Sequence, residues 1–326
     1  MNNIILIGAG NIGSRHLQGL RLVEFPLHIT VVDPSPEAQE RANKLFHQVE
    51  ARSDFLGELH FASNIPTNHS FDIAIVATSS TIRRVITEQL LDNNQVRHLI
   101  LEKFLFQRIE DYKIIAGLLE RKNVAAFVNC PRRLYPFYQG LKQTLKSENG
   151  PVEFHFSGTN WGLACNGVHR IDLFAFLTGN SHFNIDVSDL ENTIVKSKRS
   201  GYMEFNGRIE ASTEAGDKMI VSSFSAGNAP NLQIINTPSR RYVISEKQRF
   251  MFVSESLNNW EWVRKDFDMP FQSQLSNVFV KQLLTIGKCQ LTSYEESSRH
   301  HQEALKGMLD HMSRLGNEKI ELCPIT

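Results

Sequence analysis

The chain has 326 residues, enough for two domains of ordinary size, and its 41% hydrophobic and 21% charged residues are typical of a globular protein. Lysine plus arginine equals aspartate plus glutamate at 35 each, so no overall field favours nucleic acid or an anionic membrane. No apolar run approaches the length of a membrane span, and the N-terminus lacks the features of a signal peptide. We therefore expect a cytoplasmic protein with neither a nucleic-acid nor a membrane partner.

The four cysteines are scattered along the chain and form no CxxC motif. This indicates free thiols in a reducing compartment, not a disulfide framework or a zinc site. The histidines, including the pair His300 and His301, show no metal-ligand spacing. The sequence therefore predicts no metal site.

The first elements predict a βαβ unit that binds a dinucleotide. An apolar strand over residues 3–8 leads into a glycine turn in which Gly8, Gly10 and Gly13 form the pattern GxGxxG, and a helical pattern follows. Gly8 permits the tight turn, Gly10 lets the backbone approach the pyrophosphate, and Gly13 lets helix and strand pack closely. The helix begins at Asn11 and Ile12, where free N–H groups favour phosphate.

Asp33 ends the second predicted strand, 20 residues after Gly13. Its carboxylate can accept hydrogen bonds from both ribose hydroxyls and would repel a 2′-phosphate, which predicts NAD as the cofactor, with NADP disfavoured. Thr78, Glu102 and Lys103 follow later strands and are further candidates for cofactor binding.

Strands and helices continue to alternate up to about residue 128. Strands predicted at 71–78, 98–103 and 124–129 are separated by helical patterns, which indicates a Rossmann domain with a doubly wound parallel sheet. Lys103 then lies just past the carboxyl end of a strand, at the edge where such sheets bind ligands.

The pattern changes after that point. Short alternating strands between 190 and 265 predict a large, mostly antiparallel open sheet, with helical patterns before and after it. We expect an NAD-binding Rossmann domain at 1–128 and an α+β domain for substrate binding and oligomerisation at 129–326. Because an open sheet leaves an apolar face that needs cover, we expect a homodimer or homotetramer formed through this sheet.

These motifs resemble the glucose–fructose oxidoreductase / inositol dehydrogenase / MocA (Gfo/Idh/MocA) family over nearly the whole chain. GAGNIGSRH is similar to the family's opening motif, ILEKF to its Glu-Lys-Pro motif, and GVHRIDLFAFLTG to its helix with an active-site histidine. The resemblance implies an NAD-dependent dehydrogenase that transfers hydride between nicotinamide and a hydroxyl carbon. The implied substrate is a sugar or sugar derivative, such as a nucleotide sugar or an acidic sugar of surface-polysaccharide synthesis.

The resemblance also implies catalytic roles. Lys103 would contact the nicotinamide ribose and the reacting hydroxyl, with Glu102 fixing the strand end; a surface salt bridge is the structural alternative. His169 matches the family's histidine and would be the general base, since an imidazole with a pKa of about 6.5 suits that task. Asp172 lies one helical turn later and could orient the ring, or make only a structural hydrogen bond.

Two positions depart from the family's pattern. Phe104 replaces its proline, so either the Lys103–Phe104 bond is trans and Lys103 aims differently, or the fold tolerates a cis bond there. Cys165 stands where the family often has an aspartate, which leaves the dyad with His169 incomplete. A nucleophilic role for Cys165 is a further alternative.

Several polar residues are candidates for substrate binding, because arginine forks suit carboxylate or phosphate and a polar–aromatic set suits a sugar. They are Arg132, Arg133, Asn160, Trp161, Cys165, Asn166 and His169. Domain packing and turn formation are the structural alternatives. Two other functions stay open: an NAD-using lyase or glycosidase without net redox change, and a catalytically impaired protein that binds NAD and a sugar.

Overall fold

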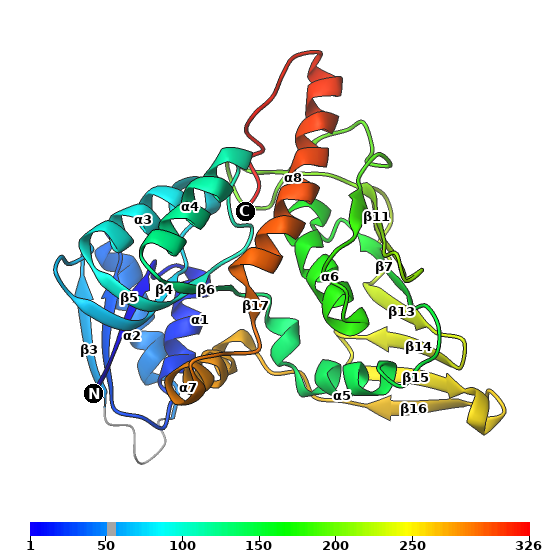
Figure 1. The fold of residues 1–326 in the computed structure, drawn as a ribbon, viewed down its shortest axis with the longest axis horizontal. Coiled ribbons are helices and arrows are strands. Elements are labelled where there is room, and N and C mark those ends of the chain that lie inside the picture. The colour runs from blue at the N-terminus through cyan, green and yellow to red at the C-terminus, as the bar shows by residue number, and fades with distance from the viewer. Residues whose placement is uncertain (51–56) are drawn as a thin grey trace. The chain divides into compact units, whose positions relative to one another are not determined.

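The computed structural model describes residues 1–50 and 57–326, and its contacts divide the chain into two compact units (Figure 1). The first unit comprises residues 1–106, 110–134 and 270–297. The second comprises residues 107–109, 135–269 and 298–326. These units differ from the expected division at residue 128 mainly in that 270–297 packs with the N-terminal unit.

The first unit is built on a sheet that, within the described residues, has seven strands in the order β17-β6-β5-β4-β1-β2-β3. Strands β1 to β6 run parallel, and only the short β17 is antiparallel to its neighbour. This confirms the predicted Rossmann sheet. The strands are β1 (Asn2–Ile7), β2 (Leu27–Val32), β3 (Gly57–Ala62), β4 (Ser70–Val76), β5 (Gln95–Leu101), β6 (Ala125–Val128) and β17 (Thr292–Ser293).

Helices join the parallel strands and cover the sheet. The central strands are nearly continuous apolar runs because a parallel sheet is buried on both faces; Ile4, Ile5 and Leu6 of β1 are fully buried. The helical elements are α1 (Asn11–Leu20), α2 (Pro36–His47), α3 (Ser80–Asn93), α4 (Ile109–Arg121), η1 (Pro131–Leu134), η3 (Gln272–Gln274) and α7 (Ser276–Ile286).

The second unit contains a sheet of eight strands, counted over the described residues, in the order β16-β15-β14-β13-β7-β12-β11-β8. All neighbours pair antiparallel except β7 and β12. The strands are β7 (Glu153–Thr159), β8 (Asn184–Asp186), β11 (Gly207–Ser212), β12 (Lys218–Phe224), β13 (Leu232–Asn236), β14 (Arg240–Ser245), β15 (Phe250–Glu255) and β16 (Trp262–Asp266). A separate pair consists of β9 (Val195–Lys196) and β10 (Met203–Glu204).

Helices α5 (Pro136–Leu145), α6 (Leu163–Thr178) and most of α8 (Tyr294–Gly316) belong to this unit, together with η2 (Ser256–Asn258). Alternate residues of the sheet, such as Phe154, Met219 and Ile235, are fully buried. The other face keeps exposed aromatic side chains, among them Phe252 and Trp262. The mostly antiparallel open sheet predicted for this part of the chain is therefore confirmed.

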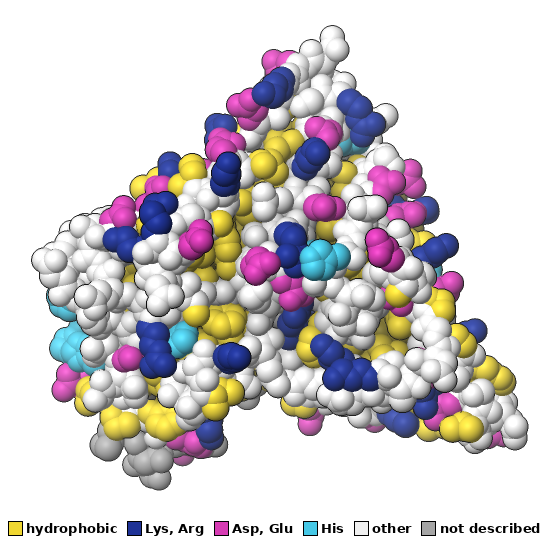
Figure 2. Space-filling model, viewed as in Figure 1, with side chains coloured by type: hydrophobic (Ala, Val, Ile, Leu, Met, Phe, Trp, Pro, Cys, Tyr) yellow, Lys and Arg dark blue, Asp and Glu magenta, His cyan; other side chains and the backbone are white. Residues whose placement is uncertain are grey.

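The protein surface mixes both signs of charge. Figure 2 shows basic and acidic side chains interspersed over the visible face, in keeping with the equal counts of the two kinds. Across residues 1–50 and 57–326, the structure contains no helix with the length and apolar character needed to cross a membrane. All four cysteines are free thiols.

Candidate cofactor and catalytic site

The glycine turn between β1 and α1 has the geometry that the GxGxxG pattern predicts. Gly8 has a φ of +98°, in the left-handed region that favours glycine. A Cβ on Gly13 would lie 1.8 Å from the carbonyl oxygen of Gly8, so only glycine lets α1 approach this closely. A Cβ on Gly10 would meet no atom within 4 Å, so space beside this backbone is open to a diphosphate.

The first turn of α1 follows directly. Asn11 is exposed and Ile12 is half-buried. The N–H of Ser14 bonds to the carbonyl of Gly10 at 2.8 Å and begins the helical ladder. The amide groups before it have no partner within the helix, and they carry the positive end of the helix dipole. This turn can therefore bind an anion beside Gly10.

Asp33, just after β2, is fixed beside the glycine turn by two backbone donors. Its Oδ2 accepts the N–H of Ala9 at 2.7 Å, and its Oδ1 accepts the N–H of Ser35 at 2.9 Å. Each carboxylate oxygen has a second lone pair, so both can still accept a ribose hydroxyl. The half-buried side chain is thus preorganised to accept hydrogen bonds from the ribose hydroxyls.

Thr78 lies just after β4. Its hydroxyl oxygen is buried and has no hydrogen-bond partner among the described residues. Because a buried hydroxyl without a partner costs about 1–3 kcal/mol, a bound ligand that supplies one would be favoured. Together with the open space at Gly10 and the position of Asp33, this fits a dinucleotide on the carboxyl edge of the sheet.

Glu102 anchors the end of β5. The side chain is buried, and its Oε1 lies 2.8 Å from Nε2 of His16 and 2.5 Å from Nδ2 of Asn129. Nδ1 of the fully buried His16 lies 2.9 Å from the Ser276 hydroxyl. The carboxylate therefore ties the strand end to α1, to the residue after β6 and, through His16, to α7.

The same contacts set the charge state of Glu102. Burial by itself would raise the pKa of this carboxyl. The pKa is nevertheless lowered, because three groups together outweigh the effect of burial. They are His16, through its hydrogen bond and charge, Asn129, through its hydrogen bond, and Arg83, through its charge. An ionised carboxylate only accepts, so His16 donates from Nε2.

Arg83 holds the turn on the other side of Lys103. It is fully buried on α3, and its guanidinium donates to the carbonyl oxygens of Thr78, Phe104 and Leu105. Sequence reasoning missed Arg83 because no motif surrounds it. Its sequence signal is weak, an arginine within the otherwise amphipathic helix STIRRVITEQLL.

Lys103 itself is half-buried and directly follows the buried Glu102. The Lys103–Phe104 peptide bond is cis, the second of the two alternatives that the phenylalanine leaves open. The backbone on both sides of Lys103 is therefore held by buried charged side chains, Glu102 before it and Arg83 after it. Because both neighbouring segments are held, the backbone position of Lys103 at the sheet edge is fixed.

Arg132 and Arg133 lie in η1, just after β6 on the same edge of the sheet. Arg133 is buried, and its guanidinium is paired with Glu296 at 2.6 Å. Arg132 is half-buried. The ion pair favours the packing alternative for Arg133, and anion binding by either arginine stays a prediction.

In the second unit, α6 carries Cys165, His169 and Asp172. The helix starts after Gly162, which has a φ of +85°. Glu204 Oε2 accepts the N–H groups of Ala164 at 2.9 Å and Cys165 at 3.4 Å and so caps the helix. Sequence reasoning missed this cap because its carboxylate comes from the distant β10.

Cys165 is buried and fully engaged in packing. Its sulfur lies 3.8 Å from the carbonyl oxygen of Met203 and 3.5 Å from the backbone nitrogen of Thr326. His169 is half-buried one turn further on, and Asp172 is buried after it. A buried thiol with backbone partners is a poor nucleophile, so the contacts favour a structural role for Cys165.

Arg170 fixes the rotation of α6 on the sheet. Its guanidinium makes two bonds of 2.9 Å to Glu246 and lies 3.7 Å above the ring of Phe156. The Tyr138 hydroxyl also bonds Glu246, at 2.5 Å. His169 directly precedes Arg170 on this helix.

The polar side chains of the turn before α6 form hydrogen bonds within the protein. Asn160 donates to the carbonyl of Ser225 at 3.1 Å and accepts from Asn206 at 3.1 Å. The indole N–H of Trp161 donates to a β12 carbonyl at 2.9 Å, and Asn166 donates to the carbonyl of Trp161 at 3.4 Å. These bonds favour the turn-forming alternative, while sugar binding stays a prediction.

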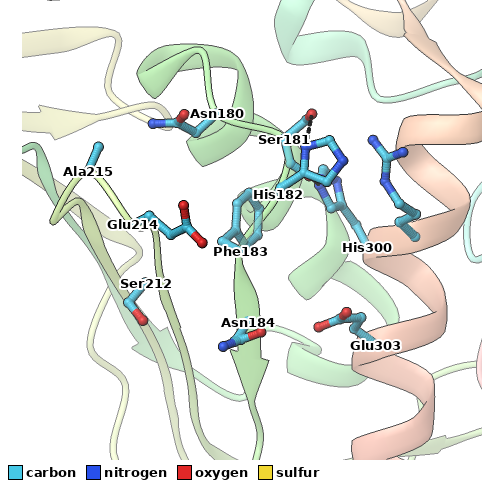
Figure 3. Close-up of a pocket in the computed structure, with 11 residues that line it drawn as sticks. Asn180, Ser181, His182, Phe183, Asn184, Ser212, Glu214, Ala215, His300 and Glu303 are labelled. Atoms are coloured by element: carbon cyan, nitrogen blue, oxygen red, sulfur yellow. Dashed lines mark hydrogen bonds between the residues drawn. The ribbon is translucent and has the colours of Figure 1, made fainter.

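Two cavities lie away from all of these residues. In the second unit, a cavity of about 420 Å³ is bounded by the segment after α6, the β11–β12 turn and α8, and Figure 3 shows Glu214 and Glu303 entering from the last two. In the first unit, a cavity of about 510 Å³ borders the amino end of the parallel sheet around Asp72 and Arg97. Neither contains a predicted site residue, and the carboxyl edge of the sheet remains the better cofactor site because its donors are preorganised there.

The parallel sheet, the glycine turn and the acid after β2 define the class as an NAD-binding Rossmann protein. Residues 2–130 match the family model GFO_IDH_MocA, described as "Oxidoreductase family, NAD-binding Rossmann fold". This domain is therefore similar to the NAD-binding domain of the Gfo/Idh/MocA oxidoreductases, as the motifs predict, and its cofactor class is a nicotinamide dinucleotide.

Solved structures extend the likeness over both units. An oxidoreductase from Agrobacterium radiobacter, in complex with NAD+, L-tartaric acid and magnesium, superimposes with a TM-score of 0.70 at 15% identity, covering 97% of this chain and 99% of that one. UDP-N-acetylglucosamine 3-dehydrogenase from Acidithiobacillus ferrooxidans gives 0.66 at 13% identity, covering 93% and 95%. A Gfo/Idh/MocA family oxidoreductase from Vibrio cholerae gives 0.69 at 13% identity, covering 98% and 100%. No curated protein sequence matches this chain.

Proposed function

We propose that this protein is an NAD-dependent dehydrogenase that acts on a CH–OH group of a sugar or sugar derivative. The observation that carries the proposal is the placement of Lys103: a lysine at the carboxyl edge of an NAD-binding sheet, with its backbone held by Glu102 on one side and Arg83 on the other. The fold shared with a UDP-sugar dehydrogenase supports the substrate class.

Bound NAD supplies the acceptor for the hydride. Lys103 orients the substrate hydroxyl and stabilises developing negative charge on its oxygen, because an ammonium is a compact positive donor. His169 takes the hydroxyl proton as the C–H hydride leaves, so the products are a carbonyl compound, NADH and a protonated imidazole. Asp172 would then stabilise the imidazolium.

Substrate recognition would fall to the polar residues that the sequence predicts for this task. Arg132 would bind a carboxylate or phosphate of the substrate as a fork. Asn160 and Asn166 would contact sugar hydroxyls through their side-chain amides, and Trp161 would pack its indole ring against the apolar face of the sugar.

Self-association would use the open face of the second unit's sheet, where Phe252 and Trp262 are exposed. We expect a homodimer or homotetramer in a reducing, cytoplasmic setting. Light scattering after size-exclusion chromatography would measure the mass, and Trp262→Glu should shift it toward the monomer.

The decisive experiment is a thermal-shift screen of sugars, sugar acids and nucleotide sugars with NAD present, followed by NADH absorbance for each ligand found. A ligand that raises the unfolding temperature and yields one NADH per product supports the proposal. A product formed without net NADH would replace it with lyase or glycosidase chemistry. Tight binding without any turnover would make the protein a sugar-binding partner instead of an enzyme.

A further inference from the structure

A cluster of two histidines and one glutamate lies on the first unit, away from every residue used above. His28 is on β2, and Glu58 and His60 are on the neighbouring strand β3. The register places His28 directly opposite Glu58 and Thr30 opposite His60. Since alternate residues of a strand project to the same face, the three side chains share one face of the sheet.

We propose that His28, Glu58 and His60 bind a divalent transition-metal ion, with Zn²⁺ as the reference ion. Oε2 of Glu58 lies 3.0 Å from Nδ1 of His28 and 3.7 Å from Nε2 of His60. One ligand atom from each residue can be chosen so that all lie within 4.8 Å of one another. The two imidazole rings are stacked, with centroids 4.7 Å apart and planes inclined by 28°.

These separations suit tetrahedral coordination. Ligands at about 2.0–2.1 Å from Zn²⁺ lie about 3.3 Å from one another in a tetrahedron. The two distances from Glu58 bracket that value, so small rotations of the three side chains would bring the ligand atoms together. Two imidazoles and one carboxylate are a common protein ligand set for zinc, and a water molecule can complete it.

Ion pairing without a metal ion explains the cluster of His28, Glu58 and His60 less well than metal binding does. The side chains of His28, Glu58 and His60 are 37%, 60% and 58% exposed, and exposed ion pairs contribute about 0–1 kcal/mol. The same exposure leaves the site accessible to an ion from solvent. Figure 2 shows histidine side chains gathered at the surface on the side of the molecule where Figure 1 draws β3.

The site would join the edge strand to the rest of the sheet. Among the described strands, β3 is the last in the sheet order, and an edge strand has one row of backbone groups without a partner in the sheet. An ion held by both β2 and β3 would crosslink them, and β2 continues into Asp33 at its carboxyl end. The expected role is structural, a metal clip on the nucleotide-binding domain, and it stands independently of the reaction proposed above.

The test is a Zn²⁺ titration of the full-length protein without a polyhistidine tag, after treatment with a chelator. Isothermal titration calorimetry should give one saturable site per chain, and Zn²⁺ should raise the unfolding temperature. His28→Ala, Glu58→Gln and His60→Ala should each weaken binding by at least about tenfold, because each removes one of three protein ligands. With Co²⁺ as the probe, His60→Ala should also alter the visible absorption bands.

His69→Ala is the matched control, because His69 is another exposed histidine of the first unit and lies outside the cluster. It should bind Zn²⁺ as the wild type does. The proposal is overturned if the wild type shows no saturable site, if His60→Ala binds Zn²⁺ equally well, or if His69→Ala loses as much affinity as the three cluster variants. Each of these results would leave the cluster as an ion-pair trio only.

Discussion

The carboxyl edge of the first unit's sheet and the helix α6 of the second unit both carry predicted site residues, but different forces position them. At the sheet edge, Gly8 and Asp33 follow strand ends and are held by short backbone contacts. Lys103 follows β5, between the buried side chains of Glu102 and Arg83. On α6, which carries His169, the adjacent Arg170 bonds Glu246, 76 residues further along the chain.

This difference between the sheet edge and α6 indicates where a substitution should change function and where it should also change stability. The parallel architecture and the glycine turn fix the path of the chain at the sheet edge, so the side chains of Asp33 and Lys103 can be exchanged with little effect on that path. The orientation of α6 depends on a few buried charges, and a buried charge that loses its partner is costly. We therefore expect variants at the sheet edge to change chemistry and cofactor choice, and variants of the clusters beneath to change stability as well.

The largest effect should come from Lys103→Met. We expect turnover to fall below detection while NAD binding stays within about tenfold, because most cofactor contacts lie in the glycine turn and at Asp33. Stopped-flow or steady-state NADH formation measures turnover, and isothermal titration calorimetry measures NAD binding. Lys113→Met, on the exposed face of α4, is the control and should be as active as the wild type. Normal turnover of Lys103→Met would remove Lys103 from the mechanism.

His169→Ala should lower kcat by about 10²–10⁴-fold, the usual range for one general base. Cys165→Ala, one turn earlier on the same helix, should keep most activity, because its thiol is engaged by backbone groups. The pH–rate profile should lose its acidic limb in His169→Ala alone. The reverse pattern, with Cys165→Ala inactive and His169→Ala active, would point to thiol chemistry.

Asp33→Ser should weaken NAD binding by about 10–100-fold and should bring the NAD and NADP dissociation constants closer together. Charge-assisted hydrogen bonds to the ribose contribute about 1.5–3 kcal/mol, and the repulsion of a 2′-phosphate is removed with the carboxylate. Titration of both cofactors against wild type and variant measures the effect. Equal affinities of the wild type for NAD and NADP would contradict the assignment of Asp33.

The smallest effect is on stability. Glu102→Gln should lower the free energy of unfolding by about 1–3 kcal/mol at neutral pH, because the charge-assisted bonds with His16 and Asn129 weaken. The pKa of Glu102 is lowered by folding, so its ionised form contributes stability that is fully present above the ordinary value of 4.5. The difference between wild type and variant should therefore shrink as the pH falls below that value.

Urea denaturation at several pH values checks this. Glu110→Gln, an exposed carboxylate in the first turn of α4, is the control and should change stability little. A difference between wild type and Glu102→Gln that stays constant down to strongly acidic pH would show that the carboxylate is not ionised in the folded protein.

The sequence by itself determined the Rossmann sheet, the cofactor class and the positions of Gly8, Asp33 and Lys103 along the chain. It could do so because the controlling contacts are local: a glycine turn and strand ends that a parallel sheet brings to one edge. It also predicted the open antiparallel sheet from the alternation of short strands.

Only the tertiary structure decided which side chains support these residues. Arg83 reaches the turn after Lys103, Glu204 caps α6, and Ser276 completes the contacts of His16. The tertiary structure alone also showed that residues 270–297 belong to the first unit. The physical reason is that buried polar groups must find partners wherever the fold brings them, and partners separated by tens or hundreds of residues leave no periodicity or spacing in the sequence.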